Sequence, residues 1–177
     1  MAVDPRVARV FFAVWPPPEV QGTLSDVAQQ AQGECGGRAV AADNIHLTLV
    51  FIGDVSRDRL ARLEALGATV AAPRFSLLVD RLEYWRHNRI LWAGVRECPQ
   101  ALRTLVERLQ ESVAAARFRI ERRPYVPHVT LRRDARGAPA NTRIRVDWPV
   151  TEFALVESAQ RARGRVYDVL RRWTLAA

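Results

Sequence analysis

The sequence predicts a two-lobed α+β fold in which antiparallel sheets, in a pseudo-twofold arrangement, surround a central cleft and helices pack on the outer faces. Two observations predict it. Short apolar strands and amphipathic helices follow one another in mixed order in both halves of the chain. In addition, the segments His46-Leu47-Thr48-Leu49 and His128-Val129-Thr130-Leu131 share one pattern. One such segment in each half indicates that both lobes contribute a similar strand to the cleft.

The first half of the chain predicts two strands and two helices. Residues 9–15 are rich in Phe and Val and read as a strand, which ends at the proline run over residues 16–18. Residues 19–32 carry apolar side chains at helical spacing until a glycine-rich stretch begins. The first histidine segment follows as a strand. Ser56 is then a candidate N-cap for a helix with apolar residues between Leu60 and Val70, which ends before Pro73.

The second half predicts a hairpin, a helix and further strands. Residues 75–79 and 90–95 read as antiparallel strands joined by a long polar turn that contains His87 and Asn88. Pro99 can open a helix whose apolar stripe, from Leu102 to Val113, has the period of an α-helix. Residues 122–127 lead in extended form into the second histidine strand. A polar loop over 132–140 and short strands over 143–146, 153–158 and 166–173 complete the chain.

Length and composition limit the class of protein. A chain of 177 residues suits one domain, so we expect residues 1–177 to form a single two-lobed domain. The hydrophobic content of 49%, and the lack of both a long apolar run and a secretion signal, predict a soluble, cytoplasmic protein with no membrane contact. We expect it to be a monomer. Cys35 and Cys98 lack the spacing of a metal site or a disulfide framework and are expected to be free thiols.

Arginine is the only strongly basic residue type in the chain. The formal net charge is +8, and all 27 basic residues are arginines. Codon usage in a GC-rich genome is the simpler account of the missing lysine. The positive surplus is a separate observation, and it favours a polyanionic partner because arginine can bind phosphate through two parallel hydrogen bonds.

The two histidine segments carry the functional prediction. Side chains alternate between the faces of a strand, so His46 and Thr48 face one side while the neighbouring leucines face the core, and the second segment repeats this. If the strands lie side by side, two imidazoles and two hydroxyls meet in one cleft. One imidazole can then accept a proton from water while the other protonates a leaving oxygen, because histidine titrates near pH ~6.5. The hydroxyls can donate to nonbridging phosphate oxygens. The pattern therefore predicts hydrolysis of a phosphodiester.

Other kinds of site fit the sequence less well. Zinc catalysis usually takes three protein ligands, and neither motif histidine has a His, Cys, Asp or Glu at ligand spacing, so we expect no metal. A nucleophile elbow of the type Gly-x-Ser-x-Gly is absent. His87 has no motif and is expected at the surface of a turn, with contact to substrate left open. Among Trp85, Trp92 and Tyr125, which could stack on a base, Trp92 suits the core and Tyr125 is the better candidate.

The chain resembles the two-histidine (2H) phosphoesterases, and within them the RNA 2',3'-cyclic phosphodiesterases, also called 2'-5' RNA ligases. The likeness covers residues 9–14 before the proline turn, His46 to Gly53, Pro127 to Arg133, and Glu157, Ser158 and Tyr167. It implies an enzyme that opens a terminal 2',3'-cyclic phosphate of RNA to a 2'-phosphomonoester without a cofactor. It also implies a weak reverse ligation of RNA ends.

Carried onto this sequence, the resemblance implies a role for each motif residue. His46 is the proton donor to the leaving 3'-oxygen, and His128 is the acceptor that activates water. Thr48 and Thr130 hold the phosphate. The implied partners are RNA ends or nucleotides that bear a 2',3'-cyclic phosphate.

The residues leave three points open. An arginine commonly occupies the place of Arg133 in the family, but Arg132 stands where the family often has a small residue, so either arginine could face the cleft. The substrate could also be a small cyclic nucleotide derivative, because the motifs specify the phosphate and not what it is attached to. Finally, the chain could be a non-catalytic RNA-end binding protein that uses the cleft to grip phosphate.

Overall fold

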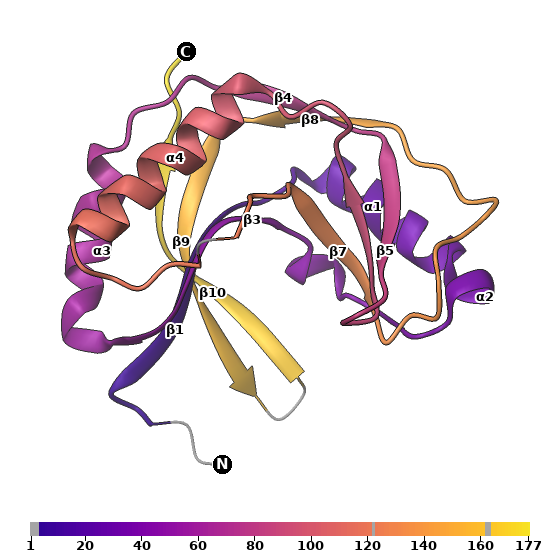
Figure 1. Cartoon of the computed structure of the whole chain (residues 1–177), viewed down its shortest axis with the longest axis horizontal. Coiled ribbons are helices and arrows are strands. Elements are labelled where there is room, and N and C mark those ends of the chain that lie inside the picture. Colours follow the sequence, from indigo (N-terminus) through magenta and orange to yellow (C-terminus); the bar gives the residue numbers. More distant parts are fainter. Residues whose placement is uncertain (1–3, 122, 162–163) are drawn as a thin grey trace.

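A computed structural model describes residues 4–121, 123–161 and 164–177 (Figure 1). The strands are β1 (Val7–Val14), β2 (Arg38–Ala39), β3 (Leu47–Ser56), β4 (Phe75–Val79), β5 (Arg81–Trp85), β6 (Ile90–Gly94), β7 (His128–Arg133), β8 (Val146–Val150), β9 (Glu152–Arg161) and β10 (Gly164–Thr174). The helices are α1 (Pro18–Gln30), α2 (Gln32–Cys35), α3 (Leu60–Thr69) and α4 (Gln100–Ala115), with 3-10 turns η1 (Ala42–Asn44) and η2 (Arg57–Arg59).

One antiparallel sheet runs through both lobes. Its strand order is β10-β9-β1-β3-β7-β6-β5, with β2 paired to β7, while β4 and β8 form a separate two-stranded sheet. The lobes meet where β3 pairs with β7, at Leu47 opposite Val129. Helices α3 and α4 pack on the lobe that contains β3 and β9, and α1 packs on β7 and β8 of the other lobe (Figure 1). The structure confirms the predicted α+β fold.

Helices α1 and α4 connect the two lobes, because each packs on the lobe other than that of its neighbouring strand in the chain. Helix α1 follows β1 but packs on β7, and α4 precedes β7 but packs on β3. The predicted apolar stripe of α4 is buried throughout, from Leu102 to Val113. Leu47 and Leu49 of β3 and Val129 and Leu131 of β7 join the same core cluster. One continuous core therefore fixes the two histidine segments relative to each other.

The predicted hairpin partner of β6 is wrong. Strand β6 pairs with β5 through a four-residue turn over residues 86–89, and β4 pairs with β8 instead. Residues 81–85 were missed because Arg81 and Glu83 interrupt the apolar pattern of this strand. β5 lies at the end of the strand order, where charged side chains are tolerated and protect the free edge.

Three local predictions also change. Ser56 ends β3 and precedes η2, its hydroxyl bonds to Asp58, and α3 begins at Leu60 without a side-chain cap. The strand predicted at 143–146 lies at Val146–Val150 and includes Pro149, which is tolerated because β8 pairs on one side alone. The glycine-rich stretch after α1 forms α2 and β2. Arg122, in the segment predicted to be extended, lies outside the described residues.

No helix in the described part of the chain is long and apolar enough to cross a membrane.

Candidate active site

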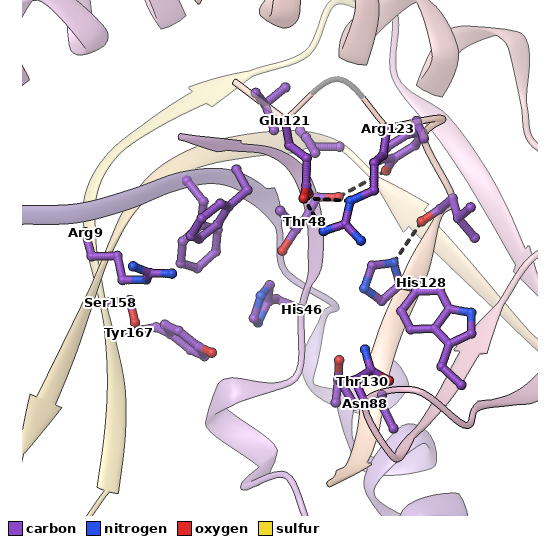
Figure 2. A pocket seen from close by; sticks show the side chains of 18 of the residues that line it. Arg9, His46, Thr48, Asn88, Glu121, Arg123, His128, Thr130, Ser158 and Tyr167 are labelled. Atoms are coloured by element: carbon purple, nitrogen blue, oxygen red, sulfur yellow. Dashed lines mark hydrogen bonds and ion pairs between the residues drawn. The ribbon is translucent and has the colours of Figure 1, made fainter. Parts of the chain in front are cut away.

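A cavity of about 480 Å³ lies where the two lobes meet, and both histidine segments line it. His46 lies directly before β3, and His128 is the first residue of β7. Because Leu47 pairs with Val129, the segments lie side by side, as the sequence argument required. Figure 2 shows the two imidazoles on opposite sides of this cavity. The fold thus brings together two histidines that are far apart in the chain.

Both imidazoles are held in the same way. Nδ1 of His46 lies 2.7 Å from the carbonyl oxygen of Asn44, and Nδ1 of His128 lies 2.8 Å from that of Val126. A carbonyl oxygen only accepts, so Nδ1 of each ring carries a proton and donates it. Each ring is therefore anchored to the main chain two residues earlier, and Nε2 is left to exchange a proton with a ligand.

The surroundings of the two rings favour their neutral form. Burial lowers the pKa of His46 to about 4, and the charges of His128 and Arg133 act in the same direction while the bond to Asn44 opposes them. Burial also lowers the pKa of His128, with a further contribution from Arg133. Without a ligand both rings are therefore mainly neutral at pH 7. A bound anion raises both pKa values, because opposite charge favours the protonated imidazole.

Aromatic rings support each imidazole from the side. Trp15 stacks on His46 with ring centroids 4.8 Å apart and ring planes at 19°, and Tyr167 meets His46 edge-on at 4.8 Å. Trp85 meets His128 edge-on at 4.6 Å. The indole N–H of Trp15 donates to a carbonyl of η1 at 3.1 Å, which fixes the stacked ring. Trp15 could not be predicted as a site residue, because in the sequence it reads as the end of the first strand.

Thr48 and Thr130 line the cavity beside the imidazoles, and both are half-buried. The hydroxyl of Tyr125 donates to the main-chain carbonyl of Thr48 at 3.1 Å. Burial raises the pKa of Tyr125, so the phenol keeps its proton and remains a donor. Tyr125 is one of the residues that line the cavity, and its role as a stacking surface stays a prediction. Tyr125 therefore also ties the segment before β7 to β3.

The structure separates the two neighbouring arginines. Arg133 is exposed and lines the cavity, whereas Arg132 has 0% exposure. The guanidinium of Arg132 donates to four oxygens: the carbonyls of Ala28 (2.5 Å), Gly36 (2.7 Å) and Gly37 (2.8 Å) and the side-chain oxygen of Gln32. The expectation that Arg132 could contact phosphate is therefore wrong.

A β-bulge explains which arginine reaches the cavity. Strict alternation from Thr130 would place Arg132 on the cleft face. Thr130 and Arg132, however, pair with the adjacent residues Trp92 and Leu91 of β6, so Leu131 is an extra residue. A bulge of this kind reverses the alternation beyond it. Leu131 and Arg132 are consequently both buried, and Arg133 points the other way.

Several lining residues were missed in the sequence because they come from separate elements and share no pattern: Arg9, Phe51, Glu121, Arg123 and Arg165. Figure 2 shows Arg9 and Arg123 at different ends of the cavity. His87 and Asn88 line its rim from the turn between β5 and β6. Trp92 is buried, as expected. Among residues 4–121, 123–161 and 164–177, no three His, Cys, Asp or Glu side chains are grouped so that they could hold a metal ion.

Known proteins share this sequence and geometry. The RNA 2',3'-cyclic phosphodiesterase of Escherichia coli (strain K12) is 37% identical over 170 residues, which cover 94% of this chain and 96% of that protein. The protein of the same name from Thermus thermophilus is 32% identical over 180 residues, covering 94% of this chain and 90% of that protein. The crystal structure of E. coli LigT complexed with 3'-AMP matches with a TM-score of 0.86 at 35% identity, covering 97% of this chain and 99% of that one.

A family model agrees with these relatives. Residues 14–92 and 94–167 match the model described as LigT like Phosphoesterase, and the two matched stretches each contain one histidine segment. The match covers most of the chain and both walls of the cavity. The chain therefore belongs to the LigT-like phosphoesterase family.

Proposed function

We propose that this protein hydrolyses the terminal 2',3'-cyclic phosphate of RNA to a 2'-phosphomonoester. The observation that carries the proposal is the pair of His-x-Thr segments, held side by side on one cavity with matching Nδ1 anchors. Relatives at 37% and 32% identity bear the name RNA 2',3'-cyclic phosphodiesterase. E. coli LigT has also been solved in complex with phosphate.

The two imidazoles divide the proton transfers. Water attacks the phosphorus, and Nε2 of His128 takes its proton. The bond between phosphorus and the 3'-oxygen breaks on the opposite side, and Nε2 of His46 gives its proton to that oxygen. The phosphate remains on the 2'-oxygen, and the protein ends with the proton on the other histidine. Solvent exchange restores the starting state, so no nucleophilic side chain takes part.

The neighbours of the histidines hold the phosphate in line. Thr48 and Thr130 line the cavity and lie two residues after His46 and His128, so each hydroxyl can donate to one nonbridging oxygen. Arg133 lines the cavity and adds a positive charge beside the phosphate. If the 5'-hydroxyl of another RNA attacks in the place of water, the same geometry forms a 2'-5' bond, and we propose that ligation is the weaker reaction. We also propose that the protein acts as a monomer.

Activity should depend on pH in a way that the bound phosphate changes. The reaction needs one ring protonated and one neutral, and this form becomes rarer as the pH rises above the higher of the two pKa values. In the free protein the pKa of His46 is about 4, and that of His128 lies below 6.5. We therefore expect kcat/KM to decline already as the pH rises from 6.5. Because a bound anion raises both pKa values, kcat should decline at a higher pH than kcat/KM.

Steady-state kinetics between pH 4 and 9 would check this order. The opposite order, with kcat falling at the lower pH, would show that the bound substrate does not raise the pKa values of the two histidines. A rate that stays constant across the range would exclude acid–base catalysis by these histidines.

The direct test of the proposed function is incubation of the purified protein with a short RNA that ends in a 2',3'-cyclic phosphate, with a chelator present. We expect a product whose phosphate stays on the 2'-oxygen, identified by ³¹P NMR. A 3'-phosphate would mean that the other P–O bond breaks. Binding without a product would favour an RNA-end binding protein, and turnover of cyclic mononucleotides alone would favour a small-molecule enzyme.

A further inference from the structure

We infer that the active-site cavity continues into a second subsite along α4, and that this subsite takes the nucleotide on the 5' side of the cyclic end. The inference rests on the proposed function. A second hollow of about 460 Å³ lies beside the cavity. Both hollows are lined by Gln110, Arg123, Pro124 and Tyr125, so they share one wall. The size of the second hollow is within the range of small-ligand sites, ~300–1,000 Å³.

One face of α4 and the segment before β7 form the groove. Arg103, Val106, Glu107 and Gln110 follow helical spacing on α4, and residues 123–125 form the opposite side. Cys98 lies at the end where the helix begins.

The groove joins the cavity beside the catalytic motifs. Tyr125 lines both hollows, and its hydroxyl bonds to the carbonyl of Thr48. The next residue, Val126, supplies the carbonyl that anchors His128. An RNA strand whose terminal phosphate lies between the histidines can therefore pass Tyr125 one nucleotide further upstream. Tyr125 and Pro124 offer ring surfaces there for a base or ribose, a contact that does not depend on base identity.

The charges of the groove suit the phosphate between the two nucleotides. Arg103 is exposed, and its Nε and Nη2 donate to the carbonyl of Cys98 at 3.3 Å and 3.0 Å. These bonds hold the guanidinium at the groove while Nη1 can still donate to a phosphate oxygen. Glu107 lines the same groove and carries the opposite charge. The two residues should therefore affect an upstream phosphate in opposite directions.

The test compares two substrates in the native protein and in variants of Arg103, Glu107 and Arg96. The substrates are a 2',3'-cyclic mononucleotide and a dinucleotide that ends in the same cyclic nucleotide, and the measured quantity is the ratio of their kcat/KM values. For the native protein we expect the dinucleotide to be preferred by about 10-fold, which corresponds to one charge-assisted phosphate contact. Arg103→Gln should remove most of this preference, whereas Glu107→Gln should raise it by about 2-fold. Arg96→Gln, an exposed arginine outside both hollows, should leave the ratio unchanged.

This set of variants distinguishes a loss of folding, a failure of the proposed function and the absence of the subsite. Loss of structure lowers the rates for both substrates, so it does not change the ratio of the kcat/KM values in opposite directions for Arg103→Gln and Glu107→Gln. Arg103→Lys should keep much of the preference for the dinucleotide. A native ratio near one, or the same direction of change in both variants, would overturn the subsite. If neither substrate is hydrolysed, the proposed function fails. The relative affinity for mono- and dinucleotides ending in a 2'-phosphate, measured by calorimetry in the same proteins, then decides the subsite alone.

Discussion

Replacing either His46 or His128 with alanine should lower kcat for a terminal 2',3'-cyclic phosphate by about 10³-fold, within the ~10²–10⁴-fold range for the loss of a positioned acid or base. Each ring is the proton carrier for one side of the phosphorus, so neither can replace the other within one turnover. The double replacement should cost little more than one single replacement, because residues that act as a unit are not additive. Single-turnover kinetics in the presence of a chelator would measure all three variants.

His87→Ala is the matched control. This residue is exposed and reaches the rim of the cavity from the turn between β5 and β6, so its loss should change KM more than kcat. The pH profile of each variant tests the assigned roles. Without the proton donor His46 the decline of kcat/KM at high pH should disappear, and without the acceptor His128 the rise at low pH should disappear. The reverse pattern would exchange the two roles, and near-native turnover in either variant would exclude the mechanism.

The parts of the fold that the sequence could predict are those set by local periodicity. The stripe of α4 from Leu102 to Val113 is buried as the spacing required. The alternation of the first motif also holds, because Leu47 and Leu49 are buried while Thr48 is half-buried on the other face. Such patterns need no knowledge of the partner element, since each depends on one core-facing side.

Strand pairing could not be predicted, because it depends on residues far apart in the chain. β4 has the apolar pattern expected of a partner for β6, but the four-residue turn at 86–89 brings the more polar β5 beside β6 first. β4 then pairs with β8, about seventy residues later in the sequence. A sheet edge tolerates the charges of β5, and a single sequence does not reveal where the edge lies.

The two histidines at the centre of the site could be predicted from the sequence, but the contacts that surround them could not. Two matching segments identify His46 and His128, but the stacking of Trp15 on His46 and the carbonyl anchors of both rings arise from tertiary packing. The choice between Arg132 and Arg133 depends on the bulge at Leu131, which has no signature in the residues themselves. Strict alternation would have selected the wrong arginine.

Substituting Arg132 and Arg133 by methionine should give opposite results for stability and activity. Arg132→Met leaves four oxygens of the α1–α2 corner without their donor, and the bonds to the carbonyls of Ala28 and Gly36 are fully buried. Each unpaired buried acceptor costs about 1–3 kcal/mol. Allowing for partial relaxation, we expect the free energy of unfolding to fall by about 3 kcal/mol and Tm by about 6–12 °C. Arg133→Met should change Tm by less than about 2 °C, because the side chain is exposed, but should lower kcat/KM by about 10²-fold.

Calorimetric melting and kinetics on both variants would measure this reversal. The corner cannot easily adapt to a missing guanidinium, because Gly37 has a positive φ of 70° and a Cβ there would clash with the carbonyl oxygen of Arg133. The main chain of this corner is thus already in close contact with β7, and water has little room to replace the lost donor. If Arg132→Met melted like the native protein and lost activity as Arg133→Met does, Arg132 would belong to the cavity in solution, and the bulge at Leu131 would not determine which arginine meets the phosphate.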